Sequence, residues 1–406
     1  MSDSLTLLRV TPAFDWRVVD GAPAHEENIG GLAAQVALQT VETATLGIIQ
    51  EVVTMGLSGL PREATAGDLI RVRATSGASL TGVHRRNLAW LFGVVAALVR
   101  RRRDPPDLVH VHASGLFEPL LAVLAARIVL RAPVVLTVHC SAVATYVPQS
   151  RRDEIVQVLT RAAERAAVRR AARTLTLTRR VAAKLGAGAE AMPDWVQAKR
   201  FGPGPRRAVA AAAFAQTHGV PAGVPVAVFV GRVSREKGWP ALVAAAQTMT
   251  DLNLQVIVCG DGPDLPDLRA RVQALGLEAR FTLAGAVSHD DVAGALELGS
   301  LLVLPSAHEE LGSVLIEAMA AGVPSVAYDV GGTAEAIEPG VTGVLVPAGD
   351  ERALLAAIRY ALTDPELRGS AAARGPQKAQ AEYDAASGAR RLAELYRELI
   401  AGQAPR

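Results

Sequence analysis

Residues 226–238 read VAVFVGRVSREKG, and this stretch decides the fold predicted for the second half of the chain. Its first five residues, 226–230, are apolar and mostly β-branched, which is typical of a strand buried on both faces of a parallel sheet. A polar loop follows and leads into an alanine-rich segment of helical period at 241–249. Strand, loop and helix in this order form one βα unit. Arg232 and Lys237 therefore follow the carboxyl end of a strand, where open α/β sheets bind ligands.

The same alternation of strand and helix signals runs along the whole chain. Short β-branched runs, each followed by polar or helical sequence, occur at 48–53, 108–111, 134–138, 226–230, 255–258, 301–304 and 325–327. Alanine-rich segments of helical period occur at 86–102, 153–172, 241–249, 264–275, 314–321 and 352–362. This pattern predicts an α/β protein with doubly wound parallel sheets that helices cover on both faces.

The length and the breaks in the pattern predict the domains. A chain of 406 residues is long enough for two domains. A Pro/Gly-rich break, FGPGP, lies at 201–205. We therefore expect one Rossmann-like domain at 1–200 and a second at 201–383. The tail, 384–406, is expected to form a helix that crosses back onto the first domain.

The composition excludes several classes of protein. Lysine plus arginine number 42 against 40 acidic residues, so a basic surface for nucleic acid is not indicated. The two cysteines, Cys140 and Cys259, favour a reducing cytoplasm over a disulfide framework. We expect no signal peptide, because the N-terminus, Met1-Ser2-Asp3-Ser4, begins neither a basic segment nor a long apolar run. We expect no integral membrane segment, because the most apolar helical stretch, 116–130, contains Glu118, Pro119 and Arg127. The sequence does not indicate an oligomeric state.

A second strand, loop and helix carries acidic residues. Residues 305–312 read PSAHEELG and follow the strand at 301–304. Glu309 lies in the loop, and Glu317 lies about one turn into the helix. One carboxylate can therefore accept hydrogen bonds from sugar hydroxyls and the other from a ribose diol. The amides at the start of the helix can hold a phosphate, and they belong to Gly312, Ser313 and Val314.

Three groups of residues, including Arg232 and Lys237, each have a functional interpretation and a purely structural one. Arg232 and Lys237 suit a diphosphate whose charge must be stabilised as it departs, although a solvated loop has the same composition. His139 ends the strand at 134–138 and can contact a reacting sugar, although a lone histidine is more often structural. Gly30 and Gly31 open an alanine-rich helix and can admit an anion, and an ordinary turn explains them equally well.

In chain order, the four motifs are the glycines at 30–31, His139, the loop with Arg232 and Lys237, and the segment with Glu309 and Glu317. Together they resemble the motifs of the retaining GT-B glycosyltransferases of family 4. The resemblance extends over roughly residues 28–365. It implies two Rossmann-like domains with the active site in the cleft, transfer from a nucleotide sugar, and no required cofactor. No Asp-x-Asp triplet occurs in the chain, which fits the metal-independent habit of this fold.

The resemblance also implies roles for particular residues. Gly30 and Gly31 would lie near the phosphate. Arg232 and Lys237 would bind the diphosphate. Glu309 would contact hydroxyls of the donor sugar, and His139 would contact its C6 hydroxyl. Glu317 would contact the ribose of the nucleotide. The catalytic set implied in this way is His139, Arg232, Lys237 and Glu309.

Three runs look like those of bacterial enzymes that glycosylate 2-deoxystreptamine for aminoglycoside antibiotics. They are TVHCS at 137–141, YVPQS at 146–150 and PSAHEELG at 305–312. The usual product of such enzymes is N-acetylparomamine, made from UDP-N-acetylglucosamine. The sequence departs from the wider family at Asp194-Trp195-Val196, where Asn-Gly-Val is frequent.

The acceptor implied by this narrower resemblance is a small cationic aminocyclitol. Asp15, Asp20, Glu26 and Glu27 lie beside the glycine loop and can bind ammonium groups, with Asp20 and Glu27 taken as candidates. A solvated acidic loop remains the alternative.

Four other functions remain open on the sequence. They are transfer from UDP-glucose, transfer to another small polyol, epimerisation of UDP-N-acetylglucosamine at C2, and non-catalytic binding of a nucleotide sugar. The epimerase would need further acid and base residues, which the sequence does not identify. The joint presence of the cationic loop, the two glutamates and His139 disfavours pure binding.

Overall fold

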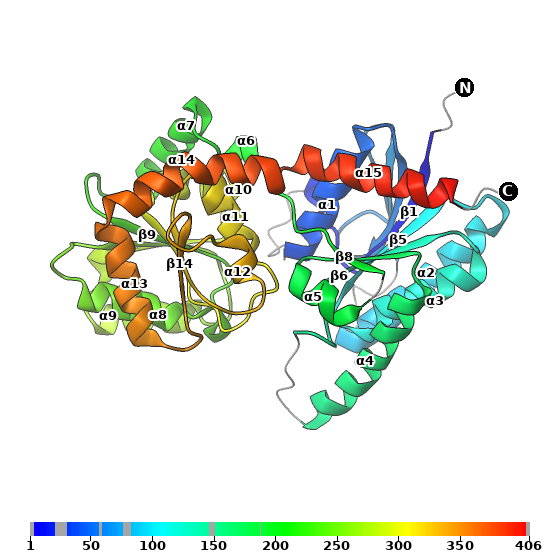
Figure 1. The fold of residues 1–406 in the computed structure, drawn as a ribbon, viewed down its shortest axis with the longest axis horizontal. Coiled ribbons are helices and arrows are strands. Elements are labelled where there is room, and N and C mark those ends of the chain that lie inside the picture. The colour runs from blue at the N-terminus through cyan, green and yellow to red at the C-terminus, as the bar shows by residue number, and fades with distance from the viewer. Residues whose placement is uncertain are drawn as a thin grey trace. The chain divides into compact units, whose positions relative to one another are not determined.

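The computed structural model describes the chain at residues 4–20, 31–56, 59–75, 83–145, 151–186 and 188–402. The chain divides into two compact units, shown in Figure 1. The N-terminal unit comprises Met1–Trp195 and Ala385–Arg406, and the C-terminal unit comprises Val196–Asp384. The units therefore meet in the chain at Trp195, somewhat before the boundary expected near residue 200, and the final helix belongs to the first unit.

The described part of the N-terminal unit contains an eight-stranded sheet with the order β3-β4-β2-β1-β5-β6-β7-β8. Its strands are β1 (Thr6–Val10), β2 (Ile49–Met55), β3 (Glu63–Ala66), β4 (Ile70–Thr75), β5 (Leu108–Ser114), β6 (Val134–Cys140), β7 (Arg173–Thr176) and β8 (Ala189–Ala191). Its helices are α1 (Gly31–Ala44), α2 (Val83–Arg100), α3 (Phe117–Val129), α4 (Arg151–Arg170), α5 (Arg179–Leu185) and α15 (Ala385–Ala401), with short 3-10 turns at Trp16–Val18 and Arg101–Arg103. All these strands pair in parallel except β3, which pairs antiparallel with β4 at one edge.

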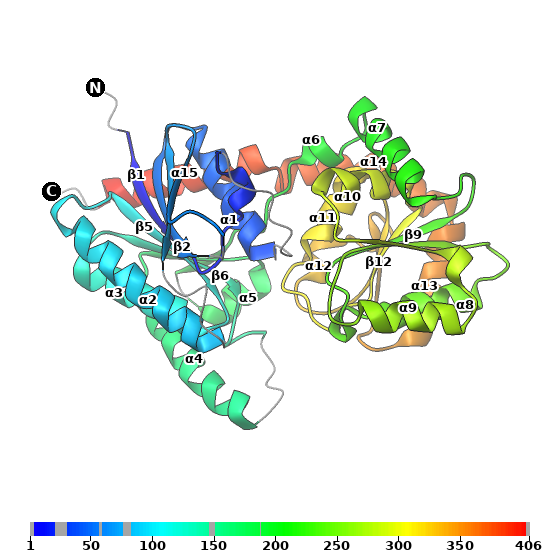
Figure 2. The ribbon, with the colours of Figure 1, turned by 180° about the vertical axis from the view of Figure 1, so that it is seen from behind.

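Alternate residues of each central strand face opposite helical layers. Leu7 and Leu108 pack with α15 on one face, and Leu8 and Val109 pack with α2 and α3 on the other. In both views of the ribbon, α1 and α15 lie on one side of this sheet and α2, α3 and α4 on the other (Figures 1 and 2). A parallel sheet buried on both faces explains why its strands are apolar throughout, because neither face meets water.

Helix α15 is anchored in the N-terminal unit by large buried side chains. Trp195 and Tyr396 are fully buried and belong to one cluster with Leu392. Gly388 faces the indole of Trp195, and a Cβ at this position would overlap the ring. The helix therefore packs against the end of the segment that leaves this unit, through a contact that only glycine permits.

The described part of the C-terminal unit contains a six-stranded, wholly parallel sheet with the order β11-β10-β9-β12-β13-β14. Its strands are β9 (Val226–Val230), β10 (Gln255–Cys259), β11 (Phe281–Gly285), β12 (Leu301–Leu304), β13 (Ser325–Tyr328) and β14 (Gly343–Val346). Its helices are α6 (Ala198–Phe201), α7 (Pro205–His218), α8 (Trp239–Thr248), α9 (Leu265–Ala274), α10 (His289–Leu298), α11 (Ser313–Ala321), α12 (Thr333–Ala336), α13 (Glu351–Thr363) and α14 (Pro365–Glu382), with 3-10 turns at Arg235–Lys237 and Glu278–Arg280.

The order of strands in this sheet reverses between β9 and β12. The chain runs from β9 outward through β10 to β11, and then returns to β12 on the other side of β9. Helices α8, α9 and α13 share a core with Phe229 on one face (Figures 1 and 2). On the other face, Gly299 at the end of α10 lies close enough to β9 that a Cβ would meet Val228. Loops that diverge from neighbouring strand ends leave room for a ligand at such a reversal.

The predicted doubly wound α/β fold is confirmed. The predicted strands at 226–230 and 301–304 have the same bounds in the structure as β9 and β12. The antiparallel β3 is a difference from the expected parallel sheets, and its half-exposed, alternating residues belong to an edge hairpin and not to a buried crossover strand. No helix within the described residues is both long enough and apolar enough to cross a membrane.

The contact of Gly388 with Trp195 predicts a stability difference between two glycine substitutions in helices. Gly388→Ala should lower stability by roughly 1–3 kcal/mol, because the added methyl overpacks the core. Gly369→Ala is the matched control, since a Cβ at Gly369 in α14 meets nothing within 4 Å, and it should leave stability unchanged or raise it slightly. Thermal unfolding followed by circular dichroism measures both. A Gly388→Ala protein as stable as the Gly369→Ala protein would contradict the contact.

Candidate functional site

In the C-terminal unit, a lysine and a glutamate meet beside the reversal of strand order. Lys237 ends the 3-10 turn after β9, and Glu309 lies in the loop after β12. The Lys237 Nζ atom donates to the Glu309 Oε1 atom at 2.7 Å. Glu309 is only 9% exposed, while Lys237 keeps more of its surface in solvent. The sequence predicted both residues for the site, and the structure joins them in one ion pair.

Backbone contacts bring the two loops together. Gly238 adopts φ +76°, and a Cβ at this position would overlap the carbonyl oxygen of Pro305. The Ala307 N–H donates to the Glu236 carbonyl at 2.7 Å. Left-handed backbone and close approach both favour glycine here, because other residues meet steric hindrance. The loop after β9 therefore lies directly against the loop after β12, which sets the separation of the ion pair.

The loop after β13 also contacts this region. A Cβ at Gly331 would overlap the carbonyl oxygen of Glu309, and Gly331 adopts φ +54°. The backbone of Glu309 is thus held from a second side. Its carboxylate is oriented by packed backbone as well as by Lys237, so it does not depend on a flexible surface loop.

Helix α11 begins a few residues after Glu309. Gly312 is its N-cap, with φ +82°, and no side chain caps the helix. Ser313 and Val314 form the first turn and are partly exposed. Backbone amides at a helix N-terminus attract anions. The predicted phosphate-holding residues are therefore at a helix start that follows the strand reversal.

Glu317 lies further along α11, on the predicted helix, and is partly exposed. Desolvation raises the pKa of its carboxyl to about 8, while Arg200 opposes the rise. A carboxyl with this pKa is largely protonated near neutral pH. A protonated carboxyl can both donate and accept hydrogen bonds, which a vicinal diol can satisfy.

Arg232 differs from Lys237 in its surroundings. It lies in the same loop after β9 but is exposed, and no ion pair involves it among the described residues. The loop on either side of it is held by the neighbouring strand end, because the Gly231 N–H donates to Cys259 and the Val233 N–H donates to Asp261. Its guanidinium is therefore available to an anion at the carboxyl edge of the sheet.

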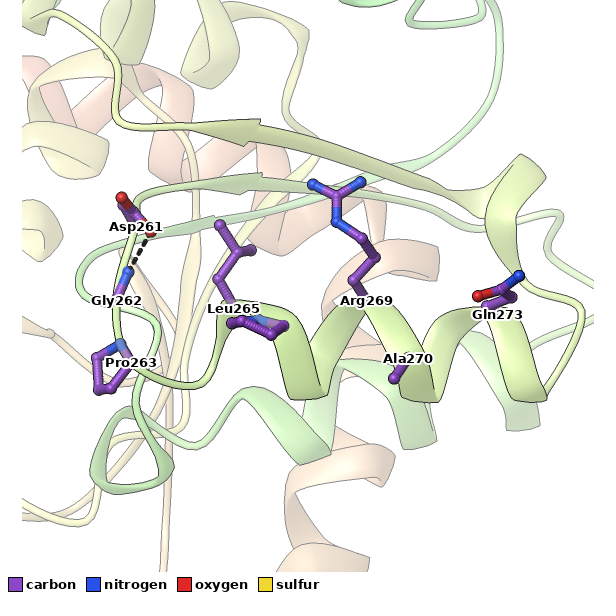
Figure 3. Close-up of a pocket in the computed structure, with 8 residues that line it drawn as sticks. Asp261, Gly262, Pro263, Leu265, Arg269, Ala270 and Gln273 are labelled. Atoms are coloured by element: carbon purple, nitrogen blue, oxygen red, sulfur yellow. Dashed lines mark hydrogen bonds between the residues drawn. The ribbon is translucent and has the colours of Figure 1, made fainter.

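A hollow of about 450 Å³ lies one strand away, beyond the end of β10 (Figure 3). Its lining includes Asp261, Gly262, Pro263 and Arg269. In Figure 3 the Asp261 carboxylate bonds to the Gly262 amide, and the Arg269 side chain extends from α9. Neither Lys237 nor Glu309 lines the hollow, so the hollow is separate from the ion pair. It lies at the carboxyl edge of the same sheet, after β10.

In the N-terminal unit, His139 is the penultimate residue of β6 and is only 7% exposed. Its Nε2 atom lies 3.0 Å from the Nδ1 atom of His112 on β5. Its Nδ1 atom lies 3.9 Å from the Asp194 Oδ1 atom. Desolvation, together with the charge of Arg9, lowers the pKa of His139 to about 3. His139 is therefore neutral near pH 7 and cannot supply positive charge.

His139 is the end of a buried polar network that the sequence did not reveal. Arg9 is fully buried on β1, and its Nη1 atom lies 2.9 Å from the His112 Nε2 atom and 3.3 Å from the His110 Nδ1 atom. The Tyr396 hydroxyl lies 2.6 Å from the same His110 nitrogen. Gln50 accepts from the Arg9 Nη2 atom at 3.0 Å. The guanidinium is surrounded in this way by neutral partners, and α15 contributes one of them.

The loop after β6 is also held by hydrogen bonds to helix α4. The carboxylate of Glu164 on α4 accepts from the Ser141 hydroxyl at 2.6 Å and from the Ala142 amide at 2.8 Å. Burial raises the pKa of Glu164, and these hydrogen bonds oppose the rise. Glu164 therefore ties Ser141 and Ala142, which follow His139, to helix α4.

The remaining predicted residues are separate from these groups. Gly31 is the first residue of α1 and is exposed. Gly30 and Glu27, with Glu26, lie outside the described residues. Asp20 is exposed and accepts from the Gly67 amide at 2.8 Å. Asp15 is buried and pairs with Arg17.

The buried polar network was not predicted, although the sequence contains a signal for some of its residues. Arg9 is the lone charge in the apolar strand β1, and His110 and His112 alternate with valine in β5, so all three lie on one face. Polar residues at alternate positions of a buried strand must find partners. Tyr396 gave no such signal, since a tyrosine on an amphipathic helix is ordinary. Asp194 was noted only as a departure from a motif.

Two doubly wound units with polar strand ends are the architecture of a GT-B transferase, and comparison with known proteins agrees. Residues 29–191 match the family model Glycosyltransferase Family 4. Residues 212–378 match the model Glycosyl transferases group 1. The chain belongs to the GT-B glycosyltransferases of family 4 and is a retaining glycosyltransferase.

Two curated relatives that resemble the chain over most of its length are named for the same acceptor. The chain is 40% identical to a 2-deoxystreptamine N-acetyl-D-glucosaminyltransferase of Streptomyces fradiae, over 89% of each chain. It is 36% identical to a 2-deoxystreptamine glucosyltransferase of Streptomyces kanamyceticus, over 82% of this chain and 90% of that one. Among solved structures, sucrose-phosphate synthase from Thermosynechococcus elongatus superposes with a TM-score of 0.82 at 23% identity, covering 98% of this chain and 100% of that one. This last likeness concerns the fold.

The raised pKa of Glu317 predicts how stability depends on pH. The folded chain keeps a proton that the unfolded chain loses from its ordinary pKa of 4.5, so wild-type stability should fall as pH rises from 4.5 to about 8. Glu317→Gln removes this group, so the variant should lose less stability over the same window. The exposed Glu394→Gln change in α15 is the control. Thermal midpoints measured from pH 5 to about 9 test this, and parallel curves for wild type and Glu317→Gln would contradict it.

Proposed function

We propose that this enzyme transfers N-acetylglucosamine from UDP-N-acetylglucosamine to 2-deoxystreptamine and so forms N-acetylparomamine. The observation that carries the proposal is the 40% identity, over 89% of both chains, to an enzyme named for this transfer. The acceptor is supported twice, because the glucosyltransferase at 36% identity is also named for 2-deoxystreptamine. The donor sugar rests on the more similar of the two relatives.

The C-terminal unit supplies groups that suit the nucleotide sugar. In this proposal, Arg232 and Lys237 bind the diphosphate, with the α11 amides from Gly312 to Val314. A cation that already faces a buried carboxylate is preorganised, so little reorganisation is needed as charge develops on the leaving group. Glu309 then takes the hydroxyls of the donor sugar, and Glu317 takes the ribose. The Lys237–Glu309 distance of 2.7 Å allows one ligand to contact both side chains.

The reaction breaks the bond between the anomeric carbon and the UDP oxygen and forms a bond from the acceptor oxygen on the same face of the sugar. The acceptor hydroxyl loses its proton to the departing phosphate oxygen, so UDP leaves as the protonated product. Arg232 and Lys237 stabilise the negative charge on that leaving group. This chain's residues therefore need to orient two substrates and exclude water, and no metal is required for the charge.

The acceptor side is assigned to the N-terminal unit. 2-Deoxystreptamine is a diamine, which carries positive charge near neutral pH. Asp20 and Glu27 are the proposed carboxylates for its ammonium groups. Asp20 already accepts one amide hydrogen bond, and its exposed carboxylate has further acceptor capacity. Gly30 and Gly31 are proposed to lie near the phosphate at the start of α1.

A second donor, UDP-glucose, is favoured by one specific observation, the 36% identity to the glucosyltransferase over 82% of this chain. The two sugars differ at C2, where an acetamido group replaces a hydroxyl. The proposed sugar contacts, His139 at C6 and Glu309 at other hydroxyls, do not distinguish the two by their chemistry. A direct assay is therefore the way to separate them.

The proposed reaction predicts a product that mass spectrometry can identify. Purified protein with 2-deoxystreptamine and UDP-N-acetylglucosamine, without added metal, should give a pseudodisaccharide with the mass of N-acetylparomamine. UDP-glucose supplied alone should give much less product. A product only from UDP-glucose would replace the donor, and no product from either donor would reject the acceptor.

Loss of the ion pair should reduce turnover strongly. Lys237→Ala and Glu309→Ala should each lower kcat/KM by about 10²–10³, because each removes a group placed at the donor. Arg359→Ala is a matched control, since Arg359 forms an ion pair with Asp251 of the same 2.7 Å length but at an exposed position. Steady-state release of UDP measures all three. Near-normal activity of both site variants would reject the assignment.

A further inference from the structure

The buried network in the N-terminal unit determines where the proton of His139 lies. The Arg9 guanidinium has only donors and stays protonated in proteins. Its Nη1 atom lies 2.9 Å from the His112 Nε2 atom, within hydrogen-bond length. Because Arg9 must donate, His112 Nε2 must accept, so this nitrogen carries no proton.

The missing proton on His112 Nε2 determines the hydrogen bond between His112 and His139. Burial and the neighbouring charges lower the pKa of His112 well below its ordinary value, so the ring is neutral. A neutral imidazole holds one proton, which must then be on Nδ1. That atom lies 3.0 Å from the His139 Nε2 atom. His112 therefore donates, His139 Nε2 accepts, and the proton of the neutral His139 is on its own Nδ1.

The other side of the His139 ring is compatible with the same tautomer. Asp194 presents its Oδ1 atom 3.9 Å from His139 Nδ1, beyond hydrogen-bond length. A carboxyl oxygen is a hydrogen-bond acceptor, so a proton on the facing Nδ1 is compatible with this side of the ring. Arg9 and His112 thus select one arrangement, and the Asp194 oxygen on the other side does not oppose it.

We propose that Arg9 and His112 are positioning residues that hold His139 in the Nδ1-protonated, neutral form, so that His139 meets the donor sugar as a hydrogen-bond donor and does not act as a general base. This inference rests on the proposed function for the placement of His139 at the donor sugar. The proton order itself follows from the network and does not need that placement. A donor N–H suits a hydroxyl oxygen of the sugar, and same-face transfer needs no base from the enzyme.

His110 offers a matched comparison for His112. Both are fully buried on β5 and both contact the Arg9 Nη1 atom, but only His112 contacts His139. His110 instead uses its Nε2 atom with the Thr137 hydroxyl at 2.7 Å. A substitution at His110 therefore disturbs the same network without removing the donor to His139.

The test uses two amides that each imitate one ring nitrogen. In His112→Gln, the amide reaches the place of Nε2 and faces Arg9, so the donor to His139 is lost. In His112→Asn, the shorter amide lies at the place of Nδ1 and can still donate to His139. His110→Gln is the control. Each protein is labelled with ¹⁵N-histidine, and His139 signals are assigned with a His139→Gln variant.

Long-range ¹H–¹⁵N spectra distinguish the tautomers, because protonated and unprotonated ring nitrogens resonate far apart. We expect Nδ1 protonation of His139 in the wild type, in His110→Gln and in His112→Asn, and a shift toward Nε2 protonation in His112→Gln. Nε2 protonation of His139 in the wild type would overturn the inference. So would a His112→Gln spectrum of His139 identical to that of the wild type.

Turnover supplies the readout that depends on the proposed function. His112→Gln should lower kcat by about tenfold with little change in the donor KM, and His112→Asn should recover most of it. A changed tautomer with unchanged kcat would overturn the role of His139 at the donor sugar, and with it that part of the proposed function. An unchanged tautomer would overturn the positioning by Arg9 and His112.

Discussion

The close approach of two backbone loops is the constraint on which the candidate site depends. Gly238 lies so near the Pro305 carbonyl that no side chain fits between them. This contact places the loop after β9 against the loop after β12, at the reversal of strand order. Lys237 and Glu309 then meet at 2.7 Å, because each is adjacent to the packed backbone. The ion pair is thus a consequence of strand order and glycine, more than of attraction between two mobile side chains.

The N-terminal unit positions its candidate residue by a different means. His139 is held by a chain of buried hydrogen bonds that begins at the fully buried Arg9. Burying a charge is costly unless all its donors find partners, and His110, His112, Gln50 and Thr43 provide acceptors. Tyr396 of α15 joins this network through His110. The last helix therefore contributes to the surroundings of a strand end far from it in sequence.

The sequence predicted the features that follow from local pattern. Apolar runs such as 226–230 and 301–304 identified strands, and the residues after them were candidates because strand ends in α/β sheets bind ligands. Pairing across the sheet was beyond such reasoning. The two histidine partners of Arg9 lie on β5, 101 and 103 residues along the chain, and depend on the parallel register of Arg9 with His110. The edge strand β3 was missed because it is short and half-exposed.

The most direct test of the central claim compares two glycines with the same backbone angle. Gly238 and Gly223 both have φ +76°, but a Cβ at Gly223 meets nothing within 4 Å. Calorimetric titration of UDP into Gly238→Ala and Gly223→Ala, with folding of each checked by circular dichroism, separates backbone strain from loss of the loop contact. The account predicts that Gly238→Ala binds UDP at least tenfold more weakly than Gly223→Ala, or about 1.4 kcal/mol. Equal affinities in two folded variants would contradict it.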